Sequence, residues 1–451
     1  MDVERRVQHV LRYGTSADGA RWAFRCSLIA AVAVFYVVGR HQWFIRDDWA
    51  FVLTREKIRL NEGTADMLFL AQDGHWMTPP ILLFRTVQRL FGLDSYWPFL
   101  ALAMVSHVAT ACMVRLLSLR SGVTPWTATV LAALFCVFGS GWEDIVFAVQ
   151  ITYNLSLLAF LVWIWLVDTD TAGVARQVAA IAAGLVCVSS SGFGPFYVLG
   201  LIVFLAVRRR WRSIAVTVGP AAVAYAWWWA SYGRDPAAEA TNGSPTQVPT
   251  FVRRGLEATF EGLTAFASLA GVAMLATLWV IIRRRHTIGN HLRVATTITC
   301  VAMFTGIGIQ RIGLGFAGAA NSRYVYVAAA LLIPVIGAAV DEAARLDRAA
   351  LWVVRTLFAT SALVNASWLQ SNSTTWAQRA LDERRLLSLV AGSGLAAQAE
   401  PSRSMLSFSP DVRVADLPLL VEEGAIVSMA PVTDADIAAV RAALGLQPVQ
   451  P

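Results

Sequence analysis

Two adjacent carboxylates, Asp47 and Asp48, stand in the segment His41–Trp49, directly after the first long apolar run. Charge is costly to desolvate where a helix leaves a membrane, so it usually faces a water-filled cavity and marks function. A carboxylate there can take the proton of a hydroxyl as that hydroxyl attacks a carbon atom. We therefore expect a general base in this pair. The sequence prefers Asp48 to Asp47 only slightly, and a solvated helix end is the alternative.

Other polar groups are expected at span ends on the same side of the membrane. An arginine there could bind a phosphate at headgroup depth, since its fork matches phosphate oxygens. A second acidic pair could orient an acceptor or share a divalent cation, either magnesium or manganese. Loop positions, interface anchors and snorkelling arginines are the alternatives. The candidate substrate-binding residues are His75, Trp76, Glu143, Asp144, Arg311, Arg323 and Tyr324, and the candidate cation ligands are Asp48, Glu143 and Asp144.

The composition predicts an integral membrane protein. Of 451 residues, 57% are hydrophobic and only 15% are charged, whereas a soluble domain carries about 25% charged residues. Many apolar runs approach the roughly 20 residues that span a bilayer. The net charge of +7 does not indicate nucleic-acid binding, because the arginines form short clusters between apolar runs, as the positive-inside rule expects.

The arginine clusters also predict the topology. Residues 1–21 form a cytoplasmic N-terminus, 22–367 a polytopic membrane domain, and 368–451 a small external segment. The fold class is thus an all-α membrane protein of about eleven transmembrane helices, with the N-terminus inside and the C-terminus outside. The expected spans are 22–39, 96–117, 126–139, 149–167, 176–191, 195–207, 213–230, 262–282, 293–309, 325–340 and 349–367.

The first external loop, 40–95, is expected to hold two helices that do not span. Residues 49–60 mix apolar and charged side chains, as in a helix lying in the membrane interface. Pro79-Pro80 should open a second helix over 79–93, because proline suits a first helical turn. Residues 231–258, rich in Gly, Pro, Ser and Thr, are expected to form another external loop.

The remaining composition bears on the host and on the cysteines. Lys57 is the only lysine, which indicates a high-GC codon bias and thus a bacterial, more narrowly an actinobacterial, plasma-membrane protein. The five cysteines lie inside apolar runs without a C-x-x-C pair. We therefore interpret them as buried small side chains.

Three motifs resemble the GT-C class of polyprenyl-phosphate-dependent glycosyltransferases. They are Arg46-Asp47-Asp48-Trp49, Gly74-His75-Trp76 with Pro79-Pro80, and Ser322-Arg323-Tyr324. The class includes protein mannosyltransferases, the aminoarabinose transferase of lipid A, and mycobacterial arabinosyl- and mannosyltransferases. The resemblance covers roughly residues 20–340.

The resemblance implies a hexosyl- or pentosyltransferase working on the outer face of the membrane. Its donor would be a polyprenyl-phosphate-linked sugar, and its acceptor a glycan, lipid or protein of the cell envelope. The base would be Asp47 or Asp48, and Arg323 would face the lipid phosphate. Glu143 and Asp144 would bind metal or acceptor, as acidic residues of a second external loop do in some members. No cofactor is required by this interpretation.

Three other functions remain open at this point. A transporter or flippase of a lipid-linked intermediate would need mid-span charges and broken helices, and the break at Gly192–Pro195 is the one feature that favours it. A polysaccharide polymerase or ligase would share the donor and the arginines, but tends to use a large late external loop. A non-catalytic scaffold is the third.

Overall fold

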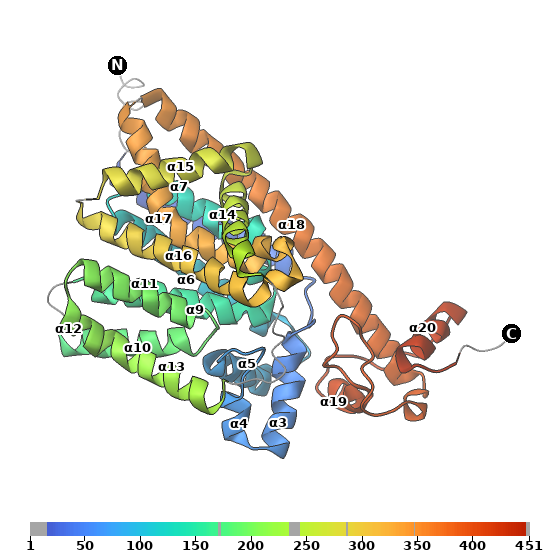
Figure 1. The fold of residues 1–451 in the computed structure, drawn as a ribbon. Helices are drawn as coiled ribbons and strands as arrows, with labels where there is room; N and C mark the ends of the chain where they lie inside the picture. The colour runs from blue at the N-terminus through green and yellow to red at the C-terminus, as the bar shows by residue number, and fades with distance from the viewer. Residues whose placement is uncertain (1–15, 170–172, 234–243, 286, 347, 448–451) are drawn as a thin grey trace.

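The protein is helical throughout the part that the computed structural model describes, namely residues 16–169, 173–233, 244–285, 287–346 and 348–447 (Figure 1). Only two isolated bridges, Gln72 with His75 and Ser404 with Arg413, have β geometry there. The main helices are α2 Ala17–Gly39, α6 Trp97–Arg120, α7 Pro125–Cys136, α9 Ile151–Val167, α10 Val174–Val188, α11 Gly194–Val207, α13 Gly219–Ser231, α14 Val248–Thr264, α15 Ala267–Arg283, α16 Ile288–Arg311, α17 Ser322–Leu346 and α18 Arg348–Gly392.

Apolar helices make this an integral membrane protein. Among the described residues, five helices are long and apolar enough to cross a bilayer: Ala17–Gly39, Trp97–Arg120, Ala148–Val167, Gly289–Arg311 and Ser322–Arg345. A bent pair, Pro245–Thr264 with Ala267–Arg283, would make a sixth, and α7, α10 and α11 are shorter apolar helices. Every predicted span overlaps a helix, while the count of eleven crossings and their orientation stay predictions.

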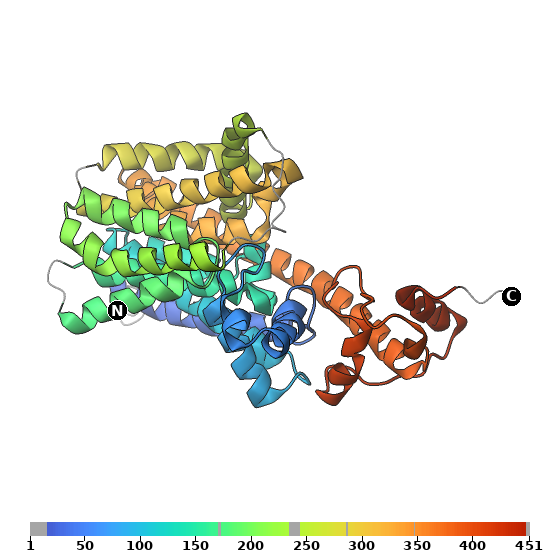
Figure 2. The ribbon, with the colours of Figure 1, turned by 60° about the horizontal axis from the view of Figure 1, so that its bottom comes forward.

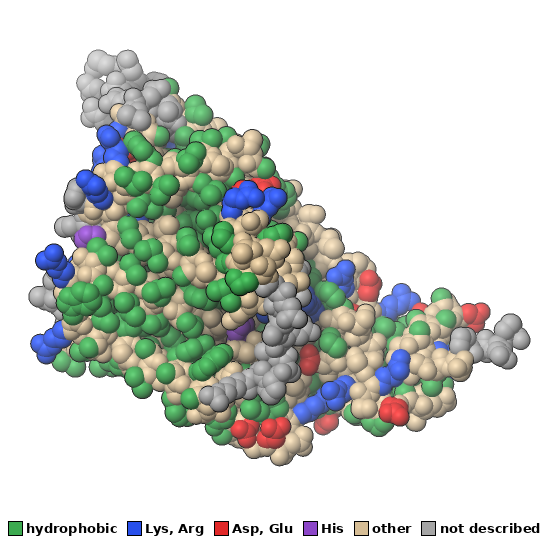
Figure 3. Space-filling view, in the orientation of Figure 1, with side chains coloured by type: hydrophobic (Ala, Val, Ile, Leu, Met, Phe, Trp, Pro, Cys, Tyr) green, Lys and Arg blue, Asp and Glu red, His purple; other side chains and the backbone are tan. Residues whose placement is uncertain are grey.

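Arginines gather at one end of the bundle. Arg120 and Arg208 both pair with Asp168 there, and Arg283 and Arg284 both pair with Glu342. In Figure 3, arginines lie along the left edge, a hydrophobic surface covers the flank, and charges of both signs gather at the lower right. This distribution agrees with the positive-inside pattern of the sequence.

The first external loop is a folded unit that packs beneath the bundle. It contains a π-helix at Ala50–Thr54, α3 Arg55–Asn61, α4 Thr64–Phe69 and α5 Thr78–Phe91. The guanidinium of Arg55 is fully buried and donates to the carbonyls of Met67 and Leu70 at the end of α4, where helical carbonyls lack partners. Both predicted helices are therefore present. The first is not simply interfacial, because its residues 50–53 are buried.

Arg85 of α5 is a second largely buried arginine of this unit. It is only 9% exposed and pairs with Glu56. The ion pair joins α5 to α3 and compensates the cost of burying the charge.

The C-terminal segment is carried by a single long helix and packs on the first loop. Helix α18 has 45 residues, so the predicted last span and the start of the external segment form one continuous rod (Figure 2). After it come α19 Leu417–Glu422 and α20 Asp434–Leu444. Thr54 donates to Asp411 at 2.8 Å, Lys57 pairs with Asp416 at 2.8 Å, and Gln88 donates to Glu423 at 2.9 Å.

The predicted loop 231–258 and the predicted span 262–282 need correction. Residues 248–258 belong to α14, and the span is split by a 107° bend between α14 and α15. Ala265 at the bend has φ 61°, a left-handed conformation that ends a helix. Apolar content could not reveal α14, since it is amphipathic and packs on α16 and α17. Residues 234–243, and 1–15 of the predicted N-terminal segment, lie outside the described residues.

Candidate active site

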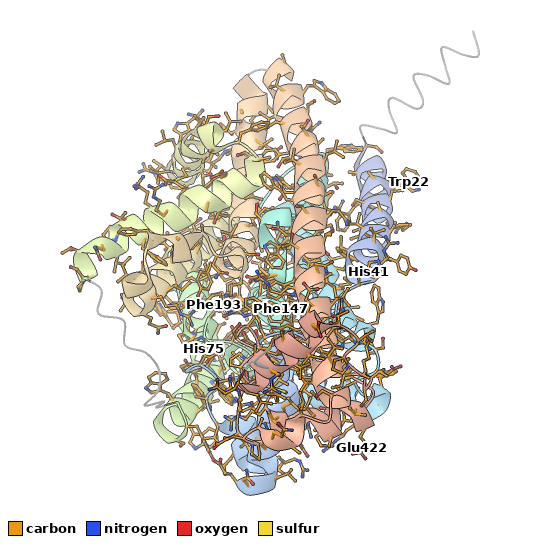
Figure 4. All side chains as sticks on the ribbon, turned by 90° about the vertical axis from the view of Figure 1, so that its right-hand side faces the viewer. Trp22, His41, His75, Phe147, Phe193 and Glu422 are labelled. Carbon is orange, nitrogen blue, oxygen red and sulfur yellow. The ribbon has the colours of Figure 1, made fainter. Side chains whose placement is uncertain are left out.

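The expected site residues meet at the end of the bundle opposite the arginine clusters. The loop after α2, the turn before α9, the α10–α11 turn and the start of α17 all reach this end. In Figure 4, Phe147, Phe193 and His75 lie together near the centre, where the bundle meets the first loop and the C-terminal segment. Residues from four parts of the sequence can therefore act on one substrate.

Asp48 is a structural residue, not the preferred base. Its side chain is fully buried and accepts three hydrogen bonds: from Ile45 N at 3.2 Å, from Tyr96 Oη at 2.8 Å and from Val149 N at 3.0 Å. Burial raises its pKa to about 8, although the three donors oppose this change. The carboxylate ties the first loop to α6 and α9, and its bonds leave little room for a substrate hydroxyl. The slight preference for Asp48 as base is thus not supported.

Asp47 has the properties that Asp48 lacks. It is half-buried, and its carboxylate makes no hydrogen bond or ion pair with the described residues. Burial raises its pKa, Arg46 and Arg323 act in the opposite direction, and Asp73 and Asp411 raise it further. A carboxylate that is partly exposed, unbonded and raised in its proton affinity suits a general base.

Arg323 and Glu143 lie beside Asp47. The Arg323 guanidinium stands 6.0 Å from the ring centroid of Tyr153 and 5.7 Å from that of Tyr324, and its buried Nε has no hydrogen-bond partner among the described residues. Glu143 N donates to Ser322 Oγ at 3.2 Å, which holds the short helix α8, Glu143–Val146, against the start of α17. Burial raises the pKa of Glu143, while the positive charge of Arg323 lowers it.

Asp144 faces the interior instead of the cleft. It is fully buried, and neither carboxylate oxygen has a hydrogen-bond partner in the described part of the chain. Burial, and then the neighbouring Glu143, raise its pKa well above the usual value. The structure thus separates the second acidic pair: Glu143 is next to Asp47 and Arg323, and Asp144 lies behind it.

His75 joins the first loop to the α10–α11 turn. Its ring packs so closely on Gly192 that a Cβ there would overlap Nδ1. Burial lowers its pKa to about 4, and the positive charge of Arg311 acts in the same direction. His75 is therefore neutral at pH 7 and can offer a hydrogen bond but no charge. Arg311 lies near it and is partly exposed.

Trp76 and Tyr324 are largely enclosed. Trp76 stacks on Trp228 with ring centroids 5.6 Å apart, and its indole N–H donates to Thr78 Oγ1. It is 7% exposed, so little of its ring is available to the substrate that we predicted it to bind. Tyr324 is 4% exposed and packs on Phe193. Its ring therefore serves as a packing surface for the Arg323 guanidinium.

Two residues at the site have left-handed backbone conformations. Arg46 has φ 52° and Asp73 has φ 50°. Such conformations are uncommon outside glycine and persist where surrounding contacts enforce them. For Arg46 the contact is a hydrogen bond of 2.7 Å from its N–H to Ser409 Oγ. The C-terminal segment thus helps to fix the loop that carries Asp47.

The predicted cation ligands Asp48, Glu143 and Asp144 do not come together. No group of three His, Cys, Asp or Glu side chains among the described residues is arranged to hold a metal ion. Asp48 directs its oxygens to three donors, and Asp144 lies in the interior. The described residues therefore do not support Asp48, Glu143 and Asp144 as one donor set for magnesium or manganese, and that set stays a prediction.

A groove of about 430 Å³ runs beside the acidic helix α8. It lies between α14, α17 and α18 and is lined largely by small and apolar residues. Its lining is Gly139, Ser140, Trp142, Ala258, Glu261, Gly262, Ala320, Ser322, Val325, Trp368 and Asn372. Trp142 and Ser322 directly precede Glu143 and Arg323 in the sequence, so the groove borders the helix ends that carry these two residues.

Sequence reasoning missed several residues at the site. Tyr153 lies inside one predicted span and Tyr96 is the first residue of another, and neither position carried a signal. Arg46 stands next to Asp47 and was quoted only as part of a motif. Asp411 lies in the C-terminal segment, which has no recognisable signature, so only the fold could bring it to Asp47.

No model of a protein family matches the sequence, and a search of curated proteins finds no match either. Solved structures do share its architecture. They include two crystal structures of ArnT from Cupriavidus metallidurans, one bound to undecaprenyl phosphate and one in the apo state.

Each ArnT structure aligns with a TM-score of 0.54 over 92% of this chain and 87% of the ArnT chain. The chain has the fold of ArnT. The sequence identities are only 14% and 15%, so the likeness concerns the fold. It confirms the GT-C architecture that the three motifs implied, and the ArnT fold includes the C-terminal region that those motifs did not reach.

Proposed function

We propose that this protein is a membrane glycosyltransferase that moves a sugar from a polyprenyl-phosphate donor to an acceptor of the cell envelope on the outer face. One observation carries the proposal: the half-buried, unbonded carboxylate of Asp47 lies close enough to the Arg323 guanidinium for their charges to interact, and the Arg323 Nε has no partner among the described residues. A base and a phosphate ligand are the two groups that such a transfer needs. The undecaprenyl phosphate bound by ArnT supports a lipid donor of this type.

The geometry suggests how the reaction proceeds. The acceptor hydroxyl approaches the anomeric carbon of the donor sugar, and Asp47 takes its proton. A bond forms between the hydroxyl oxygen and the anomeric carbon, while the bond from that carbon to the phosphate oxygen breaks. The polyprenyl phosphate leaves as an anion, so it needs positive charge more than a proton donor. Arg323 supplies that charge, and Glu143 is placed to hydrogen-bond the sugar or the acceptor.

The groove between α14, α17 and α18 is suited to the lipid of the donor. It joins the polar cleft at Trp142 and Ser322 and is otherwise lined mainly by small or apolar residues. A prenyl chain in this groove would place its phosphate beside Arg323. This assignment also gives a role to the amphipathic helix α14, which was not predicted as a span and which forms one side of the groove.

A transporter or flippase is favoured less by these observations. The break before α11 is where Gly192 packs on His75, so it serves the cleft and does not form an ion site within a span. Asp47, Arg323 and Glu143 lie at one end of the bundle. A transporter would place comparable charges near the middle of its spans.

The function is tested in the native host. A deletion strain and a complemented strain are compared by mass spectrometry of envelope glycolipids, polysaccharides and proteins, together with the polyprenyl-phosphate sugar pool. The proposal expects one glycan to lose a sugar and the matching donor to accumulate. If the deletion strain still forms every glycan linkage and only the distribution of lipid-linked intermediates between the two sides of the membrane changes, the flippase would be favoured.

A further inference from the structure

Two guanidinium groups meet over one aromatic ring at the junction of the first loop and the C-terminal segment. The Cζ of Arg46 lies 4.9 Å from the ring centroid of Phe408, and the Cζ of Arg379 lies 4.4 Å from the same centroid. The three residues come from the loop after α2, from α18 and from the segment after α18. Folding therefore brings two positive charges to one aromatic ring, and we name Arg46, Arg379 and Phe408 the Phe408 site.

Neither guanidinium of the Phe408 site has an ionic partner of its own. Within the described residues, Arg46 makes hydrogen bonds only through its backbone N–H and C=O, and Arg379 makes no side-chain hydrogen bond or ion pair. Cation–π contact offsets only part of the repulsion between like charges. Several arginines elsewhere in this chain are matched with carboxylates, as Arg385 is with Asp436 at 3.1 Å. Two unmatched guanidiniums on a ring favour a bound anion.

The nearby carboxylates do not fill this role. Glu383 feels the charge of Arg379, but it is buried and accepts a hydrogen bond of 2.6 Å from Ser409 Oγ. Asp411 accepts from Thr54 at 2.8 Å. The positive charge of Arg46 lowers the pKa of Asp47 and of Glu143, but neither carboxylate makes an ion pair with Arg46. These carboxylates thus leave both guanidiniums without an ion pair among the described residues, and Arg379 is exposed while Arg46 is partly exposed.

Aromatic contacts connect the Phe408 site to the proposed catalytic cleft. Phe408 packs on Trp376 with centroids 5.6 Å apart, and Trp376 packs on Trp142 with centroids 5.1 Å apart. Trp142 directly precedes Glu143. Arg46 directly precedes Asp47. An anion at the Phe408 site therefore lies on the C-terminal side of the cleft, whereas Arg323 and Arg311 lie on the side of α16 and α17.

We propose that the Phe408 site binds an anionic group, a phosphate or a carboxylate, of the acceptor. This inference rests on the proposed glycosyl transfer. It assigns Arg379 and Phe408 as specificity-determining residues and gives the C-terminal segment a role in substrate choice. Arg323 takes the donor phosphate, and the Phe408 site takes the acceptor charge, so the attacking hydroxyl is held between them near Asp47.

Arginine modification tests the site without knowledge of the acceptor. The full-length protein in nanodiscs of zwitterionic lipid is treated with phenylglyoxal, and the modified arginines are mapped by mass spectrometry. Inorganic phosphate is compared with sodium chloride of equal ionic strength. Arg385, exposed on the same helix, is the internal reference. At phosphate roughly ten times its dissociation constant, modification of Arg379 should slow about tenfold, and Phe408→Ala or Arg46→Gln should abolish this protection.

Three results would overturn the inference. Equal slowing at Arg379 and Arg385 means that phosphate acts on arginines in general as an adventitious ion only, and no slowing at either means that the Phe408 site does not bind the anion. Protection of Arg379 by undecaprenyl phosphate in the disc, at the same level as by inorganic phosphate, would assign the site to the donor. In a third case, phosphate protects Arg379 but the Asp47→Asn variant keeps wild-type glycans. The Phe408 site would then bind an anion without being an acceptor site. This result separates a failure of the proposed function from a failure of anion binding.

A kinetic test uses the variants Arg379→Gln and Arg379→Lys. With the product glycan identified, the glutamine variant should raise the KM for the acceptor while kcat and the KM for the donor stay close to wild type. Lysine should restore part of the loss, because it keeps the charge without the planar fork. A change in the KM for the donor alone would contradict the assignment.

Discussion

Asp47 and Asp48 are identical in type and adjacent in sequence, yet the fold gives them different roles. Asp48 is held by Tyr96 and Val149, which lie 48 and 101 residues away in the sequence. No local pattern could reveal those donors. The sequence therefore predicted that the pair matters and could not choose the base within it. Choosing required the burial and the hydrogen bonds of each carboxylate.

Asp48→Asn tests the structural role. The amide would turn an N–H group toward one of the three donors, so a buried hydrogen bond is lost and the protein is destabilised by about 1–3 kcal/mol. The melting temperature of purified protein in detergent measures this loss. Glu62→Gln, at an exposed position on the same loop, is the matched control and should melt like wild type.

The pH dependence of stability provides a second test of Asp48. Its pKa is raised from 3.8 to about 8 in the folded state. The folded protein then binds this proton more tightly than the unfolded chain, so its contribution to stability is complete below pH 3.8 and is lost as the pH rises to about 8. The amide introduced by Asp48→Asn cannot ionise. The difference in melting temperature between wild type and variant should therefore shrink as the pH rises toward about 8, and a widening difference would contradict the account.

Asp73→Asn tests the electrostatics around the proposed base. Asp73 is exposed and helps to raise the pKa of Asp47, and asparagine tolerates its positive φ of 50°. Activity requires ionised Asp47, so kcat/KM should fall as the pH drops through its raised pKa. Removing the charge of Asp73 should move this acidic limb to lower pH. A limb that stays in place, or moves to higher pH, would show that another group titrates.

Elements were easier to predict than contacts between them. Apolar runs separated by arginine clusters indicated the positions of the spanning helices, because burial in lipid requires such runs. Helix α14 escaped prediction since its apolar residues face α16 and α17 and its other face is polar. The packing of the α10–α11 turn on the first loop also escaped, because Gly192 and His75 are far apart in sequence and only the fold brings them together.

Gly192→Ala tests that contact. A Cβ at position 192 would overlap His75 Nδ1, so the ring must move and the turn must shift. Overpacking of this kind costs about 1–3 kcal/mol. The variant should lose activity and melt at a lower temperature. Gly271→Ala, where a Cβ meets nothing within 4 Å, is the control and should keep both properties.

The whole molecule has two ends of different character. One end carries the arginine clusters, and the other carries the first loop, the acidic cleft and the C-terminal segment. The sequence predicted this polarity from its charges alone. It did not predict that α18 would continue as one rod of 45 residues into the C-terminal segment. That rod places Arg379 and Phe408 next to the cleft, in a region where the sequence shows no motif.

Cysteine labelling tests the orientation of the two ends. In a variant whose five cysteines are replaced by alanine, Ser407→Cys should react with a membrane-impermeant maleimide in intact cells. Arg212→Cys, exposed at the arginine-rich end, should react only after the membrane is permeabilised. The reverse labelling pattern would place the cleft on the cytoplasmic side and would exclude an outer-face reaction.

The most direct test of the central claim is the activity of Asp47→Asn in the deletion strain. The account predicts normal expression and membrane insertion with a loss of the product glycan of roughly 100- to 10,000-fold in rate, which is the usual contribution of a general base. Glu62→Gln, expressed in parallel, should restore the wild-type glycan profile. If Asp47→Asn restores that profile as well, Asp47 is not the base, and the catalytic interpretation of the cleft is wrong.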